Sequence, residues 1–473
     1  MALHATAGSR LARFVAELEW TSVPPAIRTL VRDHVLDTIG CILAAVGGTS
    51  WAAATRTVSA DGGFPQATAA GCADLVTCRQ AAQVNGVLAR SLEFDDMAMP
   101  DLHPSGVVVP AVLAVGEHRG ATGETVLAAT AGALEALVRL GRAGFDPRSR
   151  TSRFLLRGQD SSAICGTVAA AAGAARLMGL DAEGAAHAIG IAVTMSAGSL
   201  EANRSGGSVK QFNSGRAAEP AVEAASLAVA GVTGPPTSLE GRYGFCQCFL
   251  DGDFDLDVLA GDLGNRWEIA DLRYKPYPSN YYTQAGVDAA LALRDRGLRA
   301  ADVASLRLGV ALPMLHTMGE PTDVKQRPAD GYAAKFSGPY TVACALLGGS
   351  GLGLGLDDFR DQLVRDPERV ALMARVEVEA NERCDAIFPE HAPAIVDAVT
   401  TDGTRWHEEV LTNRGSLQRP LTPDEVAAKF ATNAGPTLPA EQVEVVRDAV
   451  WDLGGAADVS TVVHSLRAAR RLR

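Results

Sequence analysis

The chain has 473 residues, more than one hydrophobic core usually serves, so two or more domains are expected. Hydrophobic residues make up 47% and charged residues 21%, which is typical of a globular protein and excludes a disordered one. The net charge is −12 and no basic stripe precedes the arginines at the end of the chain, which argues against a nucleic-acid partner.

The cellular location is predicted from features that the sequence lacks. Met1–Phe14 has no continuous apolar core of the kind that a secretory signal needs, and the alanine-rich run Val168–Ala175 is too short to span a bilayer. The eight cysteines are scattered without a Cys-x-x-Cys pair, which is typical of reduced thiols. We therefore expect a soluble, cytoplasmic protein with no membrane partner.

Helical spacing of apolar residues dominates the chain as far as Leu259. Pro24-Pro25 opens the first amphipathic run, and the nearly apolar stretch Ile164–Ala175 is typical of a helix buried among other helices. Further helices are predicted, in chain order, over Gln80–Glu93, Val107–His118, Glu124–Leu140, Ile164–Met178, Ala182–Ser196 and Ala218–Ala230.

The pattern changes near Trp267, where short β-like runs begin to alternate with helices. The β-like runs are Ser305–Leu312, Val376–Ala380 and Trp406–Leu411. The helices predicted between them are Tyr282–Arg294 and Gly338–Leu347. Helical signals resume after Leu421. We predict a mainly α protein with a helical domain over residues 1–270, a smaller α+β domain over 271–404, and C-terminal helices over 405–473 that return to the helical domain.

Patterns that signal metal or nucleotide binding are incomplete. Asp251–Asp257 resembles the start of a calcium loop, but Leu256 stands where the sharp turn requires glycine. Gly348–Gly355 lacks the spacing of a nucleotide-binding turn, and no Gly-x-Ser-x-Gly sequence occurs. No metal site is therefore predicted.

Three short motifs carry residues suited to acid–base chemistry. Glu93-Phe-Asp-Asp96 precedes His103, which lies just before a predicted helix, where carboxylates can orient an imidazole as a general base requires. Lys210 follows a glycine-rich loop, and Lys275 lies in a proline-rich segment near the predicted domain junction, where each could bind an anion. The alternative interpretations are helix caps, a flexible loop with a solvated lysine, and a rigid linker, respectively.

Taken in order, the motifs resemble the MmgE/PrpD family from about residue 9 to beyond 430. The segments that carry the resemblance are Asp37-Thr-Ile-Gly-Cys-Ile-Leu-Ala44, Phe94-Asp-Asp96, His103-Pro-Ser-Gly106, Lys210-Gln-Phe-Asn-Ser-Gly215, Lys275-Pro-Tyr-Pro278, Ala334-Lys-Phe-Ser337 and Lys429-Phe430. The resemblance implies a helical domain split in sequence, a smaller α+β lid, a homodimer, and catalysis without a metal or organic cofactor. Members of the family include 2-methylcitrate dehydratase, cis-aconitate decarboxylase and iminodisuccinate epimerase.

The resemblance also implies roles for individual residues. It makes His103 the active-site histidine, Lys210 and Lys275 the lysines that hold substrate carboxylates, and Asp96 the partner of His103. The remaining residues expected to contact the substrate are Glu93, Met97, Ser105, Asp160, Asn280 and Tyr281.

Several of these positions depart from the family pattern. Glu93 and Met97 replace an aspartate and a threonine of decarboxylase-like members, Asp160 replaces a histidine, and Asn280 stands where His or Cys is common. An added carboxylate makes the site more negative, so a tri-anion is expected to bind poorly, because an unpaired buried charge is costly. A buried Asp160 could alternatively have a raised pKa and donate a proton.

The chemistry expected is proton transfer at a carbon next to a carboxylate or imine of a small carboxylic acid. If a hydroxyl or carboxylate then leaves, the protein is a lyase, either a dehydratase or a decarboxylase, and a specialised biosynthetic pathway is the expected setting. If the proton returns on the other face, the protein is an epimerase or isomerase. A non-catalytic binding protein on the same fold is the remaining alternative, because a fold does not determine a reaction.

Overall fold

The computed structural model describes residues 6–202 and 207–470. The chain forms two compact units, which are interleaved in sequence. The first unit comprises Met1–Ser91, Asp95–Leu272 and Phe430–Arg473, and the second comprises Leu92–Phe94 and Arg273–Lys429. The predicted fold class, mainly α with a smaller α+β part, is confirmed.

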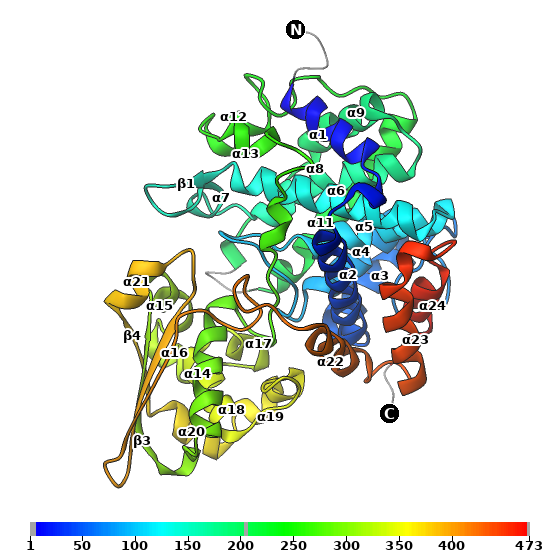
Figure 1. Ribbon diagram of the computed structural model, residues 1–473. Coiled ribbons are helices and arrows are strands. Elements are labelled where there is room, and N and C mark those ends of the chain that lie inside the picture. Colours follow the sequence, from blue (N-terminus) through cyan, green and yellow to red (C-terminus); the bar gives the residue numbers. More distant parts are fainter. Residues whose placement is uncertain (1–5, 203–206, 471–473) are drawn as a thin grey trace. The chain divides into compact units, whose positions relative to one another are not determined.

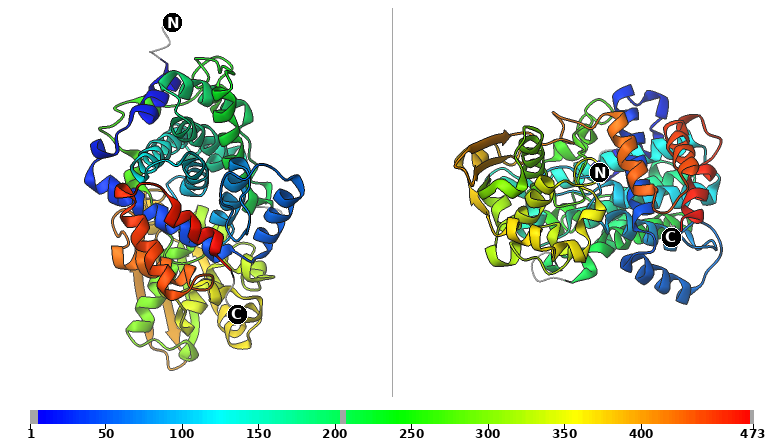
Figure 2. Two further views of the ribbon diagram at one scale, coloured as in Figure 1. Left: turned by 90° about the vertical axis from the view of Figure 1, so that its right-hand side faces the viewer. Right: turned by 90° about the horizontal axis from the view of Figure 1, so that it is seen from below.

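Among its described residues, the first unit is built of helices, apart from the two-stranded pair β1 (Phe145–Asp146) and β2 (Thr151–Ser152). Its α-helices before residue 273 are α1 (Ala7–Glu17), α2 (Pro25–Ala45), α3 (Thr49–Asp61), α4 (Cys78–Arg90), α5 (Ser105–Arg119), α6 (Gly123–Arg142), α7 (Arg153–Leu156), α8 (Ser161–Leu177), α9 (Ala182–Met195), α11 (Asn213–Val229), α12 (Phe245–Leu250) and α13 (Leu256–Ala260). After the second unit come the end of α22 (Pro423–Ala434), then α23 (Ala440–Trp451) and α24 (Ser460–Ala468). The last helices return to the first unit, where α23 lies beside α2 (Figures 1 and 2).

Small residues allow the central helices of the first unit to pack closely. Every residue of α8 from Ser161 to Ala175 is buried, which confirms the prediction that this stretch lies among other helices. The crossing of α4 and α11 is tight, because a Cβ atom added at Gly86 would lie 2.8 Å from the Cα of Gly215. Alanine and glycine at such crossings let helix axes approach.

The predicted helices are present, and their ends differ from the predictions by a few residues. The largest difference is at α11, which begins at Asn213 rather than Ala218. Among the described residues, no single helix is long and apolar enough to cross a membrane, although α2 and α3, bent by 87° at their junction, pass that test as a pair.

The second unit contains a four-stranded sheet in the order β4-β3-β5-β6. The strands are β3 (Val303–Val310), β4 (Val376–Ala380), β5 (Ala394–Thr400) and β6 (Arg405–Val410). β3 runs parallel to β4 and antiparallel to β5, with Leu308 opposite both Val378 and Val396, and β5 runs antiparallel to β6. Helices α14 (Gln284–Asp295) and α18 (Gly338–Leu347) cover one face of this sheet (Figure 1).

Short helices complete the second unit. They are α15 (Leu312–Met318), α16 (Thr322–Lys325), α17 (Gly331–Ala334), α19 (Asp361–Val364), α20 (Pro367–Met373) and α21 (Glu382–Ile387). The sequence-based boundary at residue 404 falls between β5 and β6, which pair along their length. The Asp402-Gly403 turn at this point joins two strands of a hairpin.

Candidate active site

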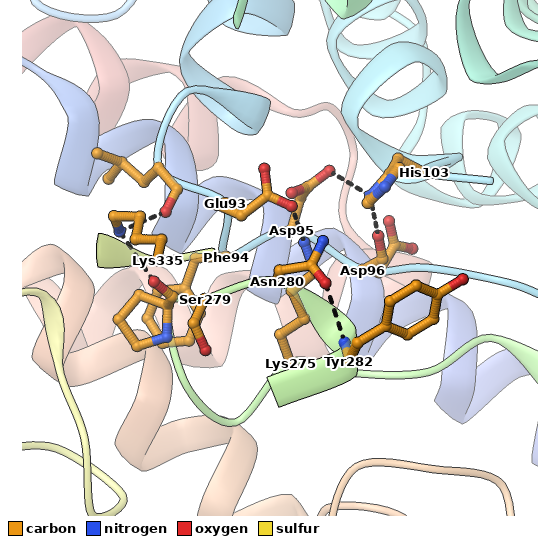
Figure 3. A network of polar contacts seen from close by, with 12 residues as sticks. Glu93, Phe94, Asp95, Asp96, His103, Lys275, Ser279, Asn280, Tyr282 and Lys335 are labelled. Carbon is orange, nitrogen blue, oxygen red and sulfur yellow. Dashed lines mark hydrogen bonds and ion pairs between the residues drawn. The ribbon is translucent and has the colours of Figure 1, made fainter. Parts of the chain in front are cut away.

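His103 lies in the loop that leads into α5, and its side chain is 12% exposed. The loop is closed by the pairing of Ala98 with Leu102, and the His103 N–H donates to Oγ of Ser162 at 2.8 Å. Nδ1 of His103 lies 3.1 Å from Oδ2 of Asp95 and 3.0 Å from the carbonyl oxygen of Asp96 (Figure 3). Because both neighbours are acceptors, Nδ1 carries the proton, and Nε2 holds the lone pair of the neutral ring.

Asp95, not Asp96, supplies the carboxylate beside His103, which corrects the pairing expected from the sequence. The carboxylate of Asp96 instead accepts from Oγ of Ser105 at 2.5 Å and from the Ser105 N–H at 3.2 Å. It also lies 3.1 Å from Nδ1 of the buried His34 on α2. Asp96 and Ser105 therefore hold the first turn of α5, directly after His103.

Lys210 lies in the 3₁₀ helix Ser208–Phe212 and is buried, 8% exposed. This short helix runs directly into α11 at Asn213. Ser205 and Gly206, at the start of the glycine-rich motif, lie outside the described residues. The lysine thus has a defined place in the first unit rather than the solvated position of the alternative interpretation.

Asp160 caps α8 and forms a buried ion pair with Arg90. Oδ2 lies 2.9 Å from Nη1 of Arg90 and accepts from Nδ2 of Asn213 at 2.7 Å, and Oδ1 accepts from the Ala163 N–H at 3.1 Å. Burial raises the pKa of Asp160, but Arg90 and these hydrogen bonds outweigh it, so that the pKa lies below the usual value. The hypothesis of a protonated donor with a raised pKa is therefore wrong, and Arg90 balances the charge of the added carboxylate.

Sequence reasoning missed two charged residues of this region. Arg90 ends an otherwise largely apolar helix, α4, and is 4% exposed. Asp101 lies two residues before His103, and burial raises the pKa of its carboxyl group against the opposing influence of His103, Arg90 and Lys210. The signals available in the sequence were an arginine at the end of an apolar helix and an acid adjacent to the histidine motif.

Lys275 and Glu93 form a buried ion pair in the second unit, with Nζ and Oε1 3.0 Å apart and side chains 0% and 3% exposed (Figure 3). The backbone of Glu93 has φ +54°, a left-handed conformation that is uncommon for residues with a side chain. Two further buried lysines bind the carbonyls on either side of Glu93, Lys335 to Leu92 at 2.7 Å and Lys429 to Phe94 at 2.9 Å.

The other predicted contact residues have local structural partners. Asn280 accepts from the Tyr282 N–H at 3.1 Å and so caps the 3₁₀ helix Tyr281–Thr283. The hydroxyl of Tyr281 donates to Asn413 at 3.1 Å. Met97 is buried, 4% exposed.

The structure thus brings together His103, Asp95, Asp96 and Ser105 in the first unit, and Lys275 with Glu93 in the second. A group of three or more His, Cys, Asp or Glu side chains able to hold a metal ion is absent from residues 6–202 and 207–470. A histidine with a fixed tautomer and buried lysines are suited to moving a proton next to a carboxylate.

Comparison with known families supports this chemistry. The MmgE/PrpD N-terminal domain matches residues 9–257, and the MmgE/PrpD C-terminal domain matches residues 277–453. The chain therefore belongs to the MmgE/PrpD family, as its motifs predicted.

Similar relatives are cis-aconitate decarboxylases. The human enzyme (Homo sapiens) is 26% identical over 404 residues, which cover 82% of this chain and 79% of the relative. The Mus musculus and Aspergillus terreus enzymes are each 28% identical, and these matches cover 82% of this chain and 78% and 80% of the relatives. The chain is accordingly an enzyme, a lyase of this family that is similar to decarboxylases.

Proposed function

We propose that this lyase removes the α-proton of a small carboxylic acid, with Nε2 of His103 as the base. The observation that carries the proposal is the hydrogen bond from Nδ1 to the Asp96 carbonyl at 3.0 Å, with Oδ2 of Asp95 at 3.1 Å, which leaves the basic lone pair on Nε2. The electron pair released from the C–H bond passes into the adjacent carboxylate, giving an enolate-like intermediate.

Lys210, in the same unit as His103, supplies positive charge for this intermediate. It is 8% exposed, and a cation in such surroundings interacts strongly with a developing anion. The family resemblance gives Lys275 the same role, although its charge is paired with Glu93 at 3.0 Å. In a dehydration, the electron pair then forms a C=C bond as the β-hydroxyl leaves with a proton. In a decarboxylation, the C–C bond to a carboxylate breaks in place of the C–H bond, its electron pair passes into the adjacent carboxylate as CO₂ leaves, and protonated His103 then gives a proton to the same carbon.

The substrate proposed is an acid other than the standard tricarboxylates of the family, as in a specialised biosynthetic pathway. The similar relatives are cis-aconitate decarboxylases, and this similarity favours decarboxylation over dehydration. The proposal about the acid is supported by Glu93, Met97 and Asn280, which depart from the family pattern. The carboxylate of Asp160 does not support this choice of substrate, because Arg90 balances its charge. By family resemblance, we further propose a homodimer that needs no metal or organic cofactor.

An epimerase of a small carboxylic or imino acid is the second candidate. His103 can also serve an epimerase, because epimerisation needs only that the proton removed by Nε2 return to the opposite face of the carbon. A non-catalytic binding protein is less well supported, because a binding site does not need an imidazole held by the Asp96 carbonyl beside the Asp95 carboxylate.

Proton NMR in deuterated buffer, with a panel of di- and tricarboxylic acids, distinguishes these candidates. The proposal predicts loss of water or carbon dioxide from one acid of the panel. Deuterium uptake or inversion at the α-carbon, with the carbon skeleton intact, would instead establish an epimerase. Turnover of 2-methylcitrate or cis-aconitate at ordinary enzyme rates would contradict the proposed choice of acid.

A further inference from the structure

Two neighbouring serines at the start of α8 hold the loop that carries His103. Oγ of Ser162 accepts from the His103 N–H at 2.8 Å, and Oγ of Ser161 donates to the carbonyl of Asp101. Both serines are buried. Serine hydroxyls in a helix often bond to their own backbone, whereas these two bind a separate segment. The loop is therefore attached to α8 on both sides of Leu102.

Asp160, the residue before these serines, holds the segment that carries Lys210. Its Oδ2 accepts from Nδ2 of Asn213 at 2.7 Å, and the N–H of Asn213 in turn donates to the carbonyl of Lys210. The carboxylate is itself held by Arg90 at 2.9 Å and by the N–H of Ala163 at 3.1 Å. Asn213 therefore links Lys210 to a carboxylate whose place is determined by α4 and α8.

The proposed base and the proposed cation of the first unit are thus tied to three consecutive residues at the start of one helix. Every residue of α8 from Ser161 to Ala175 is buried, so this helix is a firm support for the groups that contact its first turn. Such support matters to a reaction, because a displacement of about 1 Å can lower the rate by about 10²-fold.

We propose that the first turn of α8 positions His103 and Lys210 on one support, with Ser162 as the positioning residue for His103 and Asn213 for Lys210. The inference rests on the proposed function, to which it adds residues that act through the base and the cation. Asp160 is then the anchor of Asn213 rather than a ligand of the substrate, because each of its oxygens already accepts two hydrogen bonds.

The test removes one link at a time, with Ser162→Ala and Asn213→Ala, and uses Ser465→Ala as the matched control. Ser465 is also a buried serine of the first unit, but its hydroxyl donates within α24, to the carbonyl of Val462. Two labelling reactions followed by mass spectrometry need no substrate. Hydrogen–deuterium exchange at Cε1 reports on each imidazole, acylation by acetic anhydride reports on each lysine, and both are faster where a side chain is held less firmly.

We expect S162A to speed the Cε1 exchange of His103 by a factor of about 3–10, and N213A to speed the acylation of Lys210 by a similar factor, since each loses one hydrogen bond. The group that keeps its link, and the half-buried His187 on α9, should react as in the control variant. Unchanged rates at His103 and Lys210 would overturn the proposal, and so would an equal rise at His187, which would indicate a general loosening of the first unit.

Turnover tests the consequence for the reaction. The acid identified by the NMR assay should be turned over about 10–100-fold more slowly by S162A and by N213A, and at the native rate by S465A. Native turnover by both variants would overturn the proposal. Failure of the proposed lyase reaction would appear as silence of the native enzyme in the NMR assay, and the labelling pattern would still show whether the first turn of α8 holds the two side chains.

Discussion

The Arg90–Asp160 ion pair is buried, so its loss should destabilise the folded protein. We predict that Asp160→Asn lowers the free energy of unfolding by about 3–5 kcal/mol, because the buried guanidinium loses the charge of its partner at 2.9 Å. Urea denaturation followed by circular dichroism measures this change. The double variant Arg90→Met, Asp160→Asn should recover part of the loss.

Asp251→Asn is the matched control for this prediction. Asp251 also pairs with an arginine, Arg157, at 2.9 Å, but its side chain is 74% exposed. Surface ion pairs contribute about 1 kcal/mol or less, so D251N should be nearly as stable as the native protein. Equal losses in the free energy of unfolding for D160N and D251N would show that the buried Arg90–Asp160 pair stabilises the protein no more than a surface pair.

Asp101 should make the stability of the protein depend on pH. Burial raises the pKa of its carboxyl group above the ordinary value of 3.8, so ionising it disfavours the folded state. As the pH rises from 3.8 through the folded pKa, the native protein therefore loses a contribution to stability that Asp101→Asn does not lose. We predict that D101N is more stable than the native protein at pH 7 and that this gain disappears near pH 3.8. Thermal denaturation across pH tests this, and a gain that is constant with pH would contradict it.

The sequence predicted the residue types of the site better than their pairing. His103, Lys210 and Lys275 could be selected because an imidazole and lysines stand out in glycine- and proline-rich loops. The choice between Asp95 and Asp96 depends on backbone angles in an irregular loop, which composition does not determine. The compensation of Asp160 by Arg90 joins residues 70 apart in the chain, so no local pattern could reveal it.

At the scale of elements, the crossing of α4 and α11 holds the start of α11 in place, and Lys210 lies just before that start. We predict that Gly86→Ala destabilises the protein by about 1–3 kcal/mol, because its Cβ would lie 2.8 Å from the backbone of Gly215. Activity should fall as well, since α11 begins three residues after Lys210. Chemical denaturation and turnover measure the two effects.

Gly455→Ala is the control for the helix-crossing prediction. A Cβ at Gly455 has nothing within 4 Å, so this substitution should change neither stability nor activity appreciably. A G86A variant as stable as G455A would mean that α4 and α11 can separate without cost.

Strand prediction succeeded where side chains alternate and failed where they do not. Val376–Ala380 was located without error, but β5 was not predicted. β5 lies in the interior of the sheet order, and its burial alternates from Val396 to Thr400. The residue types do not follow this alternation, because Val399 lies on the less buried face and Thr400 on the buried one.

At the scale of the whole molecule, we predict a homodimer, as the family resemblance implies. Sedimentation equilibrium should give twice the chain mass of 49.2 kDa. His103→Ala should have the same mass, because the histidine acts in the reaction rather than in assembly. A mass of 49.2 kDa for the native protein would contradict the prediction.

Family membership determines the fold, and the similarity to decarboxylases supports a lyase, whereas the reacting acid depends on a few side chains. The relatives are 26–28% identical, so the core helices can be shared while contact residues such as Glu93 and Asn280 differ. The ordered motifs therefore revealed the family from the sequence, but they did not reveal the substrate.

The central claim is that His103 transfers the α-proton, and deuterium exchange tests it most directly. The rate of α-proton exchange of the turned-over acid is measured by NMR in deuterated buffer for the native enzyme, His103→Ala and His118→Ala. His103 directly precedes α5, and His118 is exposed in the last turn of that helix, so it serves as the matched control. We predict that H103A loses exchange by a factor of about 10²–10⁴ while H118A retains it, because a positioned base contributes about that much. Exchange in H103A at the native rate would contradict the account.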